Sequence, residues 1–330
     1  MLPLPLLPPR RPPGRFLMVW GRAVHLVDEG GAGADGPVAL LESGLGGSWL
    51  GWDPVAAELL PPPDRSPAAE PAGGRADEPA EGPRPLRVLR ADRPGLGRSQ
   101  PAPGVPSLAL RAAWTAALLD AVGVRVPVVV CGHSLGGLYA EAFARLYPGR
   151  VAGVVLVEAH APNVTGAVLG HRQARVRAAR LAGHAFRCAG LSQVVAPGVR
   201  RLGMRTQSAR RGDQSDVGDA YRSAYGAGHC LTEAMVERVL VRDFLAELAE
   251  LRATTRFPQV PLRVLCGVGA APEVYGAQAA MSPLGRRVEV EGALHLMPVD
   301  RPDAIAAAVR EAAAGPPRAL PSPRFYDACP

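Results

Sequence analysis

The sequence of 330 residues contains no lysine. All 37 of its basic residues are arginine, against 30 acidic residues, which gives a net charge of +7. Complete replacement of lysine by arginine is typical of a GC-rich coding sequence, so the basic balance alone does not indicate nucleic-acid binding. Aromatic residues are also scarce, at 5%, and the core therefore has to be built from valine, leucine and alanine.

Cysteine is sparse, and no metal-ligand spacing or disulfide framework is visible among the five cysteines, at positions 131, 188, 230, 266 and 329. Cys131 and Cys266 lie in apolar runs, where a thiol acts as a small hydrophobic group in a reducing compartment. Long apolar runs are absent too: none approaches the roughly 18 residues of a membrane span, and prolines interrupt the apolar N-terminus. We therefore expect a soluble, cytoplasmic protein.

Short apolar runs separated by helical segments are abundant. They predict strands at residues 16–20, 23–27, 38–41, 86–90, 127–131, 151–157, 262–268 and 288–290. Several are continuous Val/Leu runs, as expected of parallel strands covered on both faces, and the first two are expected to form an antiparallel edge. Helix starts are indicated at Asp53-Pro54, at Ser107 and at Pro302-Asp303. This alternation predicts an α/β fold with a doubly wound, mostly parallel sheet.

Two stretches depart from the alternation. Residues 61–85 are charged and of low complexity, which predicts a flexible surface insertion. Residues 163–257 carry helical patterns between two strands of the predicted sheet, as an inserted helical lid would. The rest is predicted to comprise a disordered segment at 1–15, a core in two parts at 16–162 and 258–315, and a flexible tail at 316–330.

The strongest motif is Gly132-His133-Ser134-Leu135-Gly136, which stands between an apolar strand and an alanine-rich helix. This is a G-x-S-x-G nucleophile elbow in its required context. A sharp strand-to-helix turn exposes the serine hydroxyl, and only glycine fits at the flanking positions. The N–H of Leu135 would then point to where an oxyanion forms, which makes Ser134 the candidate nucleophile.

The chain resembles the α/β-hydrolase family over about residues 20–314, with gaps at the insertion and the lid. Members typically carry a His-Gly pair after the third strand, a D-R-x-G-x-G-x-S turn after the fourth, the elbow and a late histidine. Here these places hold Ser43-Gly44, the turn DRPGLGRS at residues 92–99, GHSLGG and His295. The resemblance implies a hydrolase that uses no cofactor and no metal. Dehalogenases and epoxide hydrolases of this type use an aspartate nucleophile, so Ser134 disfavours them.

One of the four motifs departs from the family pattern, because Ser43 replaces the usual histidine. The chemistry there needs a second backbone donor, and the turn SGLGGS can still present the N–H of Leu45 to an oxyanion. An ordinary glycine turn is the alternative. Asp92, in the second motif, is interpreted as a structural residue of its turn.

A serine hydroxyl becomes nucleophilic only when an imidazole takes its proton. Of the seven histidines, His295 follows the last predicted strand on a loop before the terminal helix, where family members have their base. His133 lies in the elbow itself, His25 precedes the core and His160 sits just after the sixth strand. His171, His184 and His229 fall in the predicted lid. His295 is therefore the candidate base.

The acid is ambiguous. Most family members place an aspartate just beyond the seventh strand, where this chain has Gly269, Ala270 and Ala271, with Glu273 nearby but late. The sixth strand ends with Glu158, a position that some relatives use, and a carboxylate there would need an imidazole as its partner. We predict Glu158, with Glu273 as the alternative.

The sequence thus predicts a serine hydrolase that cleaves a carboxylic ester, or a related acyl bond, of a small and fairly apolar substrate. The alternative is a binding protein that has kept the elbow but lost a working oxyanion hole and acid. Between residues 159 and 212 there are ten arginines and no acidic residue. This segment is interpreted either as a solvated helix surface or as a face that attracts an anionic substrate or lipid surface.

Overall fold

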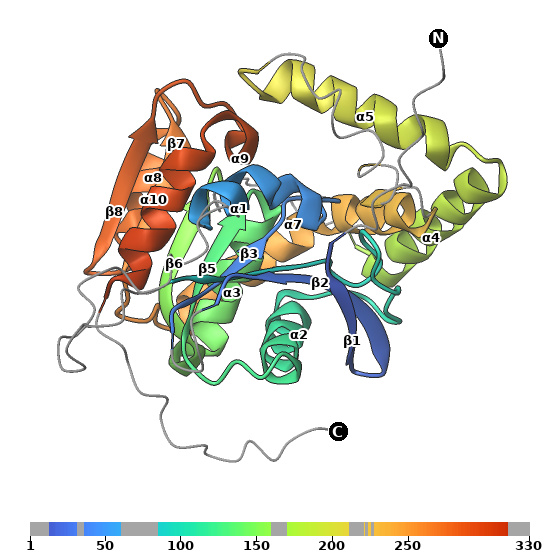
Figure 1. Cartoon of the computed structure of the whole chain (residues 1–330). Coiled ribbons are helices and arrows are strands. Elements are labelled where there is room, and N and C mark those ends of the chain that lie inside the picture. Colours follow the sequence, from blue (N-terminus) through green and yellow to red (C-terminus); the bar gives the residue numbers. More distant parts are fainter. Residues whose placement is uncertain are drawn as a thin grey trace, which may run out of the picture.

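The computed structural model describes residues 13–31, 36–60, 85–159, 170–210, 221, 224–225 and 228–315. Its centre is a sheet of eight strands among these residues, in the order β1-β2-β4-β3-β5-β6-β7-β8 (Figure 1). The strands are β1 (Arg15–Val19), β2 (Arg22–Glu29), β3 (Val38–Glu42), β4 (Arg87–Ala91), β5 (Val128–His133), β6 (Val151–Val157), β7 (Leu262–Gly267) and β8 (Gly285–Val290).

The six neighbouring strands β4, β3, β5, β6, β7 and β8 run parallel to one another. Strand β2 is antiparallel to both β1 and β4. The expected antiparallel edge and the mostly parallel, doubly wound sheet are therefore confirmed. The central strands β3 and β5 are buried along their whole length, as their continuous apolar sequences predict.

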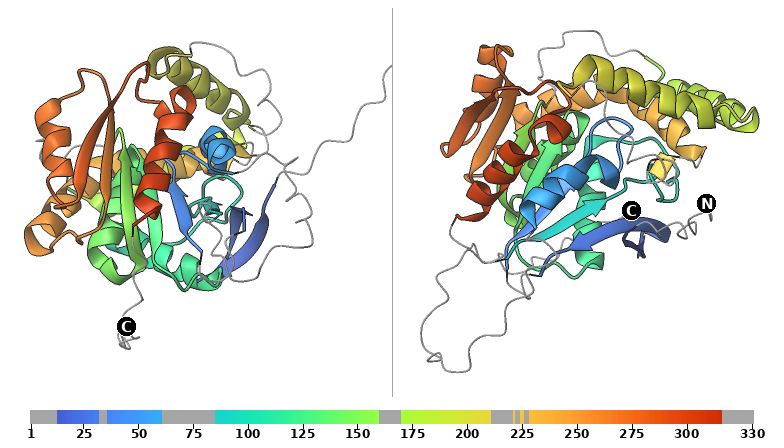
Figure 2. Two further views of the ribbon diagram at one scale, coloured as in Figure 1. Left: turned by 60° about the vertical axis from the view of Figure 1, so that its left-hand side comes forward. Right: turned by 45° about the horizontal axis from the view of Figure 1, so that its top comes forward.

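Helices cover both faces of the sheet (Figures 1 and 2). One face packs against α2 (Leu108–Ala121), α3 (Leu135–Leu146) and α8 (Pro272–Ala279), and the other against α1 (Asp53–Leu59), α9 (Met297–Asp300) and α10 (Pro302–Ala313). Short 3-10 helices lie at Trp49–Trp52 and Pro148–Arg150. The core is made mainly of Val, Leu and Ala, with Trp49, Trp52 and Phe143 as its largest apolar side chains.

Three described helices lie in the chain between β6 and β7, namely α4 (Arg172–Cys188), α5 (Ser192–Gln207) and α7 (His229–Thr254). We call them the insertion helices. In Figure 1, α5 lies at the top right and α4 at the right, and α7 runs from the middle of the molecule toward α4. The end of α5 reaches the loop after β8, where Leu296 N–H donates to Gln207 O at 2.8 Å. No helix in the described part of the chain has both the length and the apolar character of a membrane span.

Most boundaries follow the sequence predictions to within two residues. Ser107 caps α2 as predicted, since its side chain accepts a hydrogen bond from Leu110 N–H. Strand β8 begins three residues before the predicted start. Its first residues lie at the sheet edge and include two exposed or half-exposed arginines, so no apolar run marks them in the sequence. Arg15, placed in the predicted disordered N-terminus, is the first residue of β1. The segments predicted to be flexible at 61–85 and 316–330 lie outside the described residues, apart from Pro85.

Candidate active site

The turn between β5 and α3 holds Ser134 in a strained conformation, with φ of 54° and ψ of −120°. A side chain at Gly132 would lie 2.3 Å from the carbonyl oxygen of Gly136, and one at Gly136 would lie 2.2 Å from that of Glu42. Both glycines are therefore required by close backbone approach. A positive φ at a non-glycine residue costs about 1–3 kcal/mol and is held only where the surroundings enforce it. The N–H of Leu135 is the first of α3, where intrahelical acceptors are lacking.

His295 faces this turn from the loop between β8 and α9. Its Nε2 lies 3.0 Å from Ser134 Oγ, and its ring remains about one-third exposed. The ring of the preceding elbow residue, His133, lies against the loop that carries His295: its Nε2 lies 2.7 Å from the carbonyl oxygen of His295. This hydrogen bond fixes the backbone that carries the candidate base.

Glu158 follows β6 and approaches the other side of the imidazole. Its Oε2 lies 3.8 Å from His295 Nδ1, a distance for an ion pair but too long for a hydrogen bond. The carboxylate accepts hydrogen bonds from Gly267 N–H at 2.6 Å and from Tyr275 Oη at 3.2 Å. Glu158 itself has a φ of 45°. Because Gly267 ends β7, the carboxylate reaches from β6 across to the neighbouring strand end.

Electrostatics favour the ionised form of this carboxylate. Burial raises the pKa of Glu158, but the nearby imidazole of His295 and the hydrogen bonds from Gly267 N–H and Tyr275 Oη together outweigh that effect, so the pKa lies below the usual 4.5. A negative charge is thus available to stabilise an imidazolium at His295.

The alternative residues lie elsewhere. Glu273 is exposed in the first turn of α8. His25 is buried, with its Nδ1 2.9 Å from Asp92 Oδ2, while His171, His184 and His229 lie on the insertion helices and their ends. His160 lies outside the described residues. Among the described residues, the structure therefore brings Ser134 together with His295 and Glu158.

The turn after β3 contains the second candidate donor. Ser43 Oγ donates to Ser48 O at 2.9 Å, and Gly47 N–H donates to Gly44 O at 3.0 Å. A side chain at Gly44 would lie 3.1 Å from His133 Nδ1 and 3.4 Å from Ser134 Cβ. The turn thus passes directly beside the elbow, as an oxyanion hole requires.

Asp92 acts within the fold. Its carboxylate accepts hydrogen bonds from Trp49 N–H at 2.9 Å and from Arg98 N–H at 3.0 Å, and it contacts His25. It thereby ties the turn after β4 to the start of the 3-10 helix at Trp49. This agrees with the structural role that its sequence context indicates.

Sequence reasoning missed three residues around the site: Tyr275, which supports Glu158, and Arg93 with Glu237, which contact the turn after β3. Arg93 belongs to the DRPGLGRS motif, so the sequence singles out the residue, but it does not indicate which groups the side chain contacts. Glu237 lies 144 positions away from Arg93, and no local pattern connects the two.

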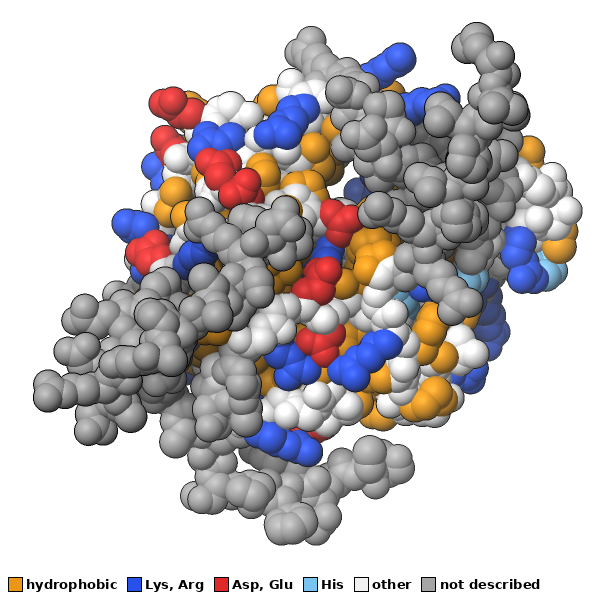
Figure 3. Space-filling view, in the orientation of Figure 1, with side chains coloured by type: hydrophobic (Ala, Val, Ile, Leu, Met, Phe, Trp, Pro, Cys, Tyr) orange, Lys and Arg blue, Asp and Glu red, His pale blue; other side chains and the backbone are white. Residues whose placement is uncertain are grey.

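The arginines of the insertion helices have two kinds of surroundings. Arg172 pairs with Glu247, Arg175 lies 2.8 Å from Asp243, and Arg180 donates to Gly104 O, so these three attach α4 to α7 and the core. Arg177, Arg201 and Arg205 are exposed. Figure 3 shows basic and histidine side chains without acidic ones at the right of the molecule, whereas both signs mix on its left.

The sequence profile of the alpha/beta hydrolase family matches residues 38–308. This chain therefore belongs to the alpha/beta hydrolase family. A Variovorax paradoxus (strain S110) protein named as a carbamate hydrolase, RutD, is 36% identical over 136 residues. That match spans 41% of this chain and 42% of the relative's own length.

Solved structures with the same fold cover nearly the whole chain. Cfl2 from Burkholderia cenocepacia superposes with a TM-score of 0.65 at 22% identity, over 90% of this chain and 94% of its own. The enol-lactonase from Burkholderia xenovorans LB400 superposes with a TM-score of 0.62 at 22% identity, and the match covers 90% of this chain and 98% of the lactonase. A thermophilic esterase from Thermogutta terrifontis superposes with a TM-score of 0.60 at 24% identity, and the match covers 90% of this chain and 97% of the esterase. At these identities the similarity shows the fold.

Proposed function

We propose that this alpha/beta hydrolase is a serine hydrolase that cleaves a carboxylic ester, or a related acyl bond, of a small and fairly apolar substrate. The distance of 3.0 Å between Ser134 Oγ and His295 Nε2 is the observation that carries this proposal. At that distance the imidazole can take the hydroxyl proton as the oxygen attacks a carbonyl carbon.

The proposed reaction has two steps. In the first, Ser134 Oγ bonds to the acyl carbon, His295 accepts the proton, and the N–H groups of Leu135 and Leu45 stabilise the oxyanion. The imidazolium, stabilised by Glu158, then protonates the leaving alcohol as the bond to it breaks. In the second step His295 activates a water molecule, which releases the acid and restores Ser134.

The acyl bond that is cleaved can belong to an ester or to a carbamate. The relative named as a carbamate hydrolase matches 136 residues of this chain, which favours including carbamates beside esters. The attack is the same in both, since a carbamate also presents a carbonyl carbon to the serine. The cytoplasmic location expected from the sequence stays a prediction.

Labelling with a fluorophosphonate probe tests the proposal, because this probe reacts only with an activated serine. We expect the wild-type chain to be labelled and the Ser134→Ala variant, shown to be folded by circular dichroism, to remain unlabelled. Folded wild-type protein that takes no label would contradict the proposal and favour the binding-protein alternative. A panel of p-nitrophenyl esters and carbamates of increasing acyl length would then define the substrate class.

A further inference from the structure

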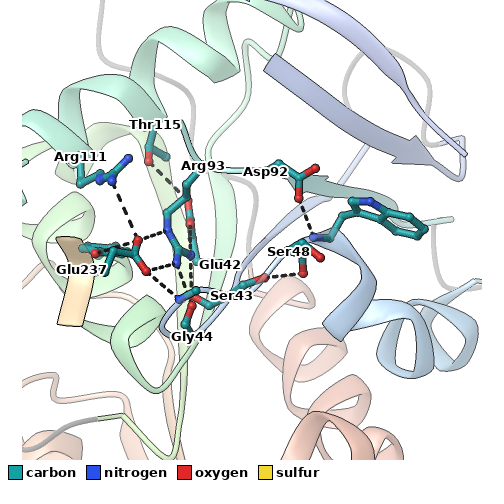
Figure 4. A network of polar contacts seen from close by, with 12 residues as sticks. Glu42, Ser43, Gly44, Ser48, Asp92, Arg93, Arg111, Thr115 and Glu237 are labelled. Carbon is teal, nitrogen blue, oxygen red and sulfur yellow. Dashed lines mark hydrogen bonds and ion pairs between the residues drawn. The ribbon is translucent and has the colours of Figure 1, made fainter. Parts of the chain in front are cut away.

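The side chain of Arg93, only 2% exposed, joins the turn after β3 to an insertion helix (Figure 4). Its Nη1 donates to Ser43 O at 2.6 Å and its Nη2 to Gly44 O at 2.7 Å. On its other side, its Nε donates to Glu237 Oε1 at 2.9 Å. The planar guanidinium thus contacts two consecutive carbonyl groups and a carboxylate through three separate nitrogens, whereas an ammonium group would have to reach all three from a single nitrogen.

Glu237, in the middle of α7 and fully buried, contacts the same turn directly. Its Oε2 accepts a hydrogen bond from Gly46 N–H at 2.8 Å as well as from Arg93 Nη2 at 3.0 Å. Two side chains therefore bind the turn: Arg93 donates to two of the turn's carbonyl groups, and Glu237 accepts from one of its amide N–H groups.

These contacts fix both peptide planes that flank Leu45. The carbonyl of Gly44 and the N–H of Leu45 belong to one planar trans peptide, so they point in opposite directions. Because Arg93 holds that carbonyl, it also sets the direction of the Leu45 N–H. The next plane contains the N–H of Gly46, which Glu237 holds. Within the described residues, no protein acceptor is recorded for the Leu45 N–H itself.

Stability alone is a weak reason for this arrangement. Desolvation of a buried ion pair offsets much of its attraction, and well-packed apolar residues often serve as well. The surroundings are unfavourable for charge: burial raises the pKa of Glu42, although Arg93 lies 3.9 Å away, and burial likewise raises the pKa of Glu233. What an apolar pair could not supply is hydrogen bonds to a turn that lacks the family's histidine at Ser43.

We propose that Arg93 and Glu237 are positioning residues that aim the Leu45 N–H at the oxyanion, and that α7 is thereby part of the catalytic apparatus. This inference rests on the proposed function. It assigns to an insertion helix a role in transition-state stabilisation, in addition to any role in covering the substrate.

The test compares Glu237→Gln with Glu233→Gln. Both residues are buried on α7 one turn apart, and both substitutions remove one negative charge, but Glu233 pairs with Arg111 and makes no recorded contact with the turn. Loss of one oxyanion donor costs about 100- to 1,000-fold in kcat, so we expect misalignment in Glu237→Gln to lower kcat by roughly 10- to 100-fold. KM for p-nitrophenyl butyrate should change by no more than about 3-fold.

The inhibition constant (Ki) of a trifluoromethyl ketone provides a second measurement, which would not change if Glu237 only stabilised the fold. The ketone forms a tetrahedral adduct on Ser134 whose oxygen occupies the oxyanion hole, so its Ki should rise by the same factor as kcat/KM falls. Glu233→Gln should leave the kcat and this Ki within about 3-fold of wild type. If Glu237→Gln is too unstable to assay, Arg93→Lys, which keeps the buried charge but loses the planar fork, serves in its place.

Wild-type kcat and Ki in a folded variant would overturn the inference, as would equal losses in both α7 variants. These results differ from failure of the proposed function, in which the wild-type chain itself would take no fluorophosphonate label.

Discussion

At the scale of single residues, the contribution of Glu158 is the most direct question. The sequence predicts Glu158 as the acid, with Glu273 as the alternative. Two properties that bear on this choice are the positive φ of Glu158 and the exposure of Glu273. Neither property has a local sequence signal. Ser134 and His295, by contrast, are marked by a motif and by a position after the last strand, and the structure places their side chains 3.0 Å apart. Their catalytic roles stay a proposal.

We expect Glu158→Gln to lower kcat by about 100- to 10,000-fold with folding retained. Glutamine keeps the size of the side chain and an acceptor for Gly267 N–H, but it cannot stabilise the imidazolium of His295. Steady-state hydrolysis of a p-nitrophenyl ester measures this. Glu273→Gln is the matched control, and a large loss in that variant with normal turnover in Glu158→Gln would reverse the assignment.

The lowered pKa of Glu158 also predicts how stability depends on pH. In the unfolded chain the pKa returns to its usual 4.5, so the ionised carboxylate stabilises the fold above that pH. This contribution is lost as the pH falls through the lower folded value. Urea unfolding of wild type and Glu158→Gln should show a difference in unfolding free energy that is constant near neutral pH and shrinks on acidification below 4.5. A difference that grows on acidification would contradict the shift.

At the scale of secondary-structure elements, the sheet was readable from the sequence because its central strands are continuous apolar runs. The cap of α2 at Ser107 and the prolines that open α1 and α10 marked helix starts equally well. The contacts between elements were not readable. The contact between Arg93 and Glu237 depends on how α7 lies across the core, which only the folded chain determines.

The elbow offers a test at this scale. A methyl group at Gly136 would lie 2.2 Å from Glu42 O, so we expect Gly136→Ala to destabilise the fold by about 1–3 kcal/mol and to displace the nucleophile. Gly276, inside α8, has open space around its missing side chain. Gly276→Ala should therefore stabilise by about 0.5–1 kcal/mol. Thermal unfolding of both variants checks the pair, and equal effects would count against the close approach.

At the scale of the whole molecule, the charge of +7 is unevenly distributed. Some arginines of the insertion helices, such as Arg172 and Arg175 of α4, pair with carboxylates of α7. These arginines have a structural role. Arg177, Arg201 and Arg205 remain exposed on these helices. A cluster of exposed arginines of this kind would attract anionic substrates.

If they do, raising the salt concentration from about 0.01 to 0.15 M should increase KM for a negatively charged ester more than for a neutral one, because screening shortens the reach of the field. The double variant Arg201→Gln, Arg205→Gln should reduce this salt effect, and Arg22→Gln, at the exposed first residue of β2, should not. Equal salt effects on charged and neutral esters would argue against steering.

The position of Glu158 at the end of β6 has a consequence for the segment just past β7. The Glu158 carboxylate, which faces the imidazole, reaches over from the neighbouring strand, and its hydrogen bonds and ion pair are made with Gly267, Tyr275 and His295 and not with residues 268–271. In the proposed mechanism, with Glu158 as the acid, these four residues take no part in the chemistry, and Val268 is 63% exposed. Randomised libraries at this segment offer a place to graft new recognition loops onto the enzyme, provided that Gly267 and Tyr275 are left in place.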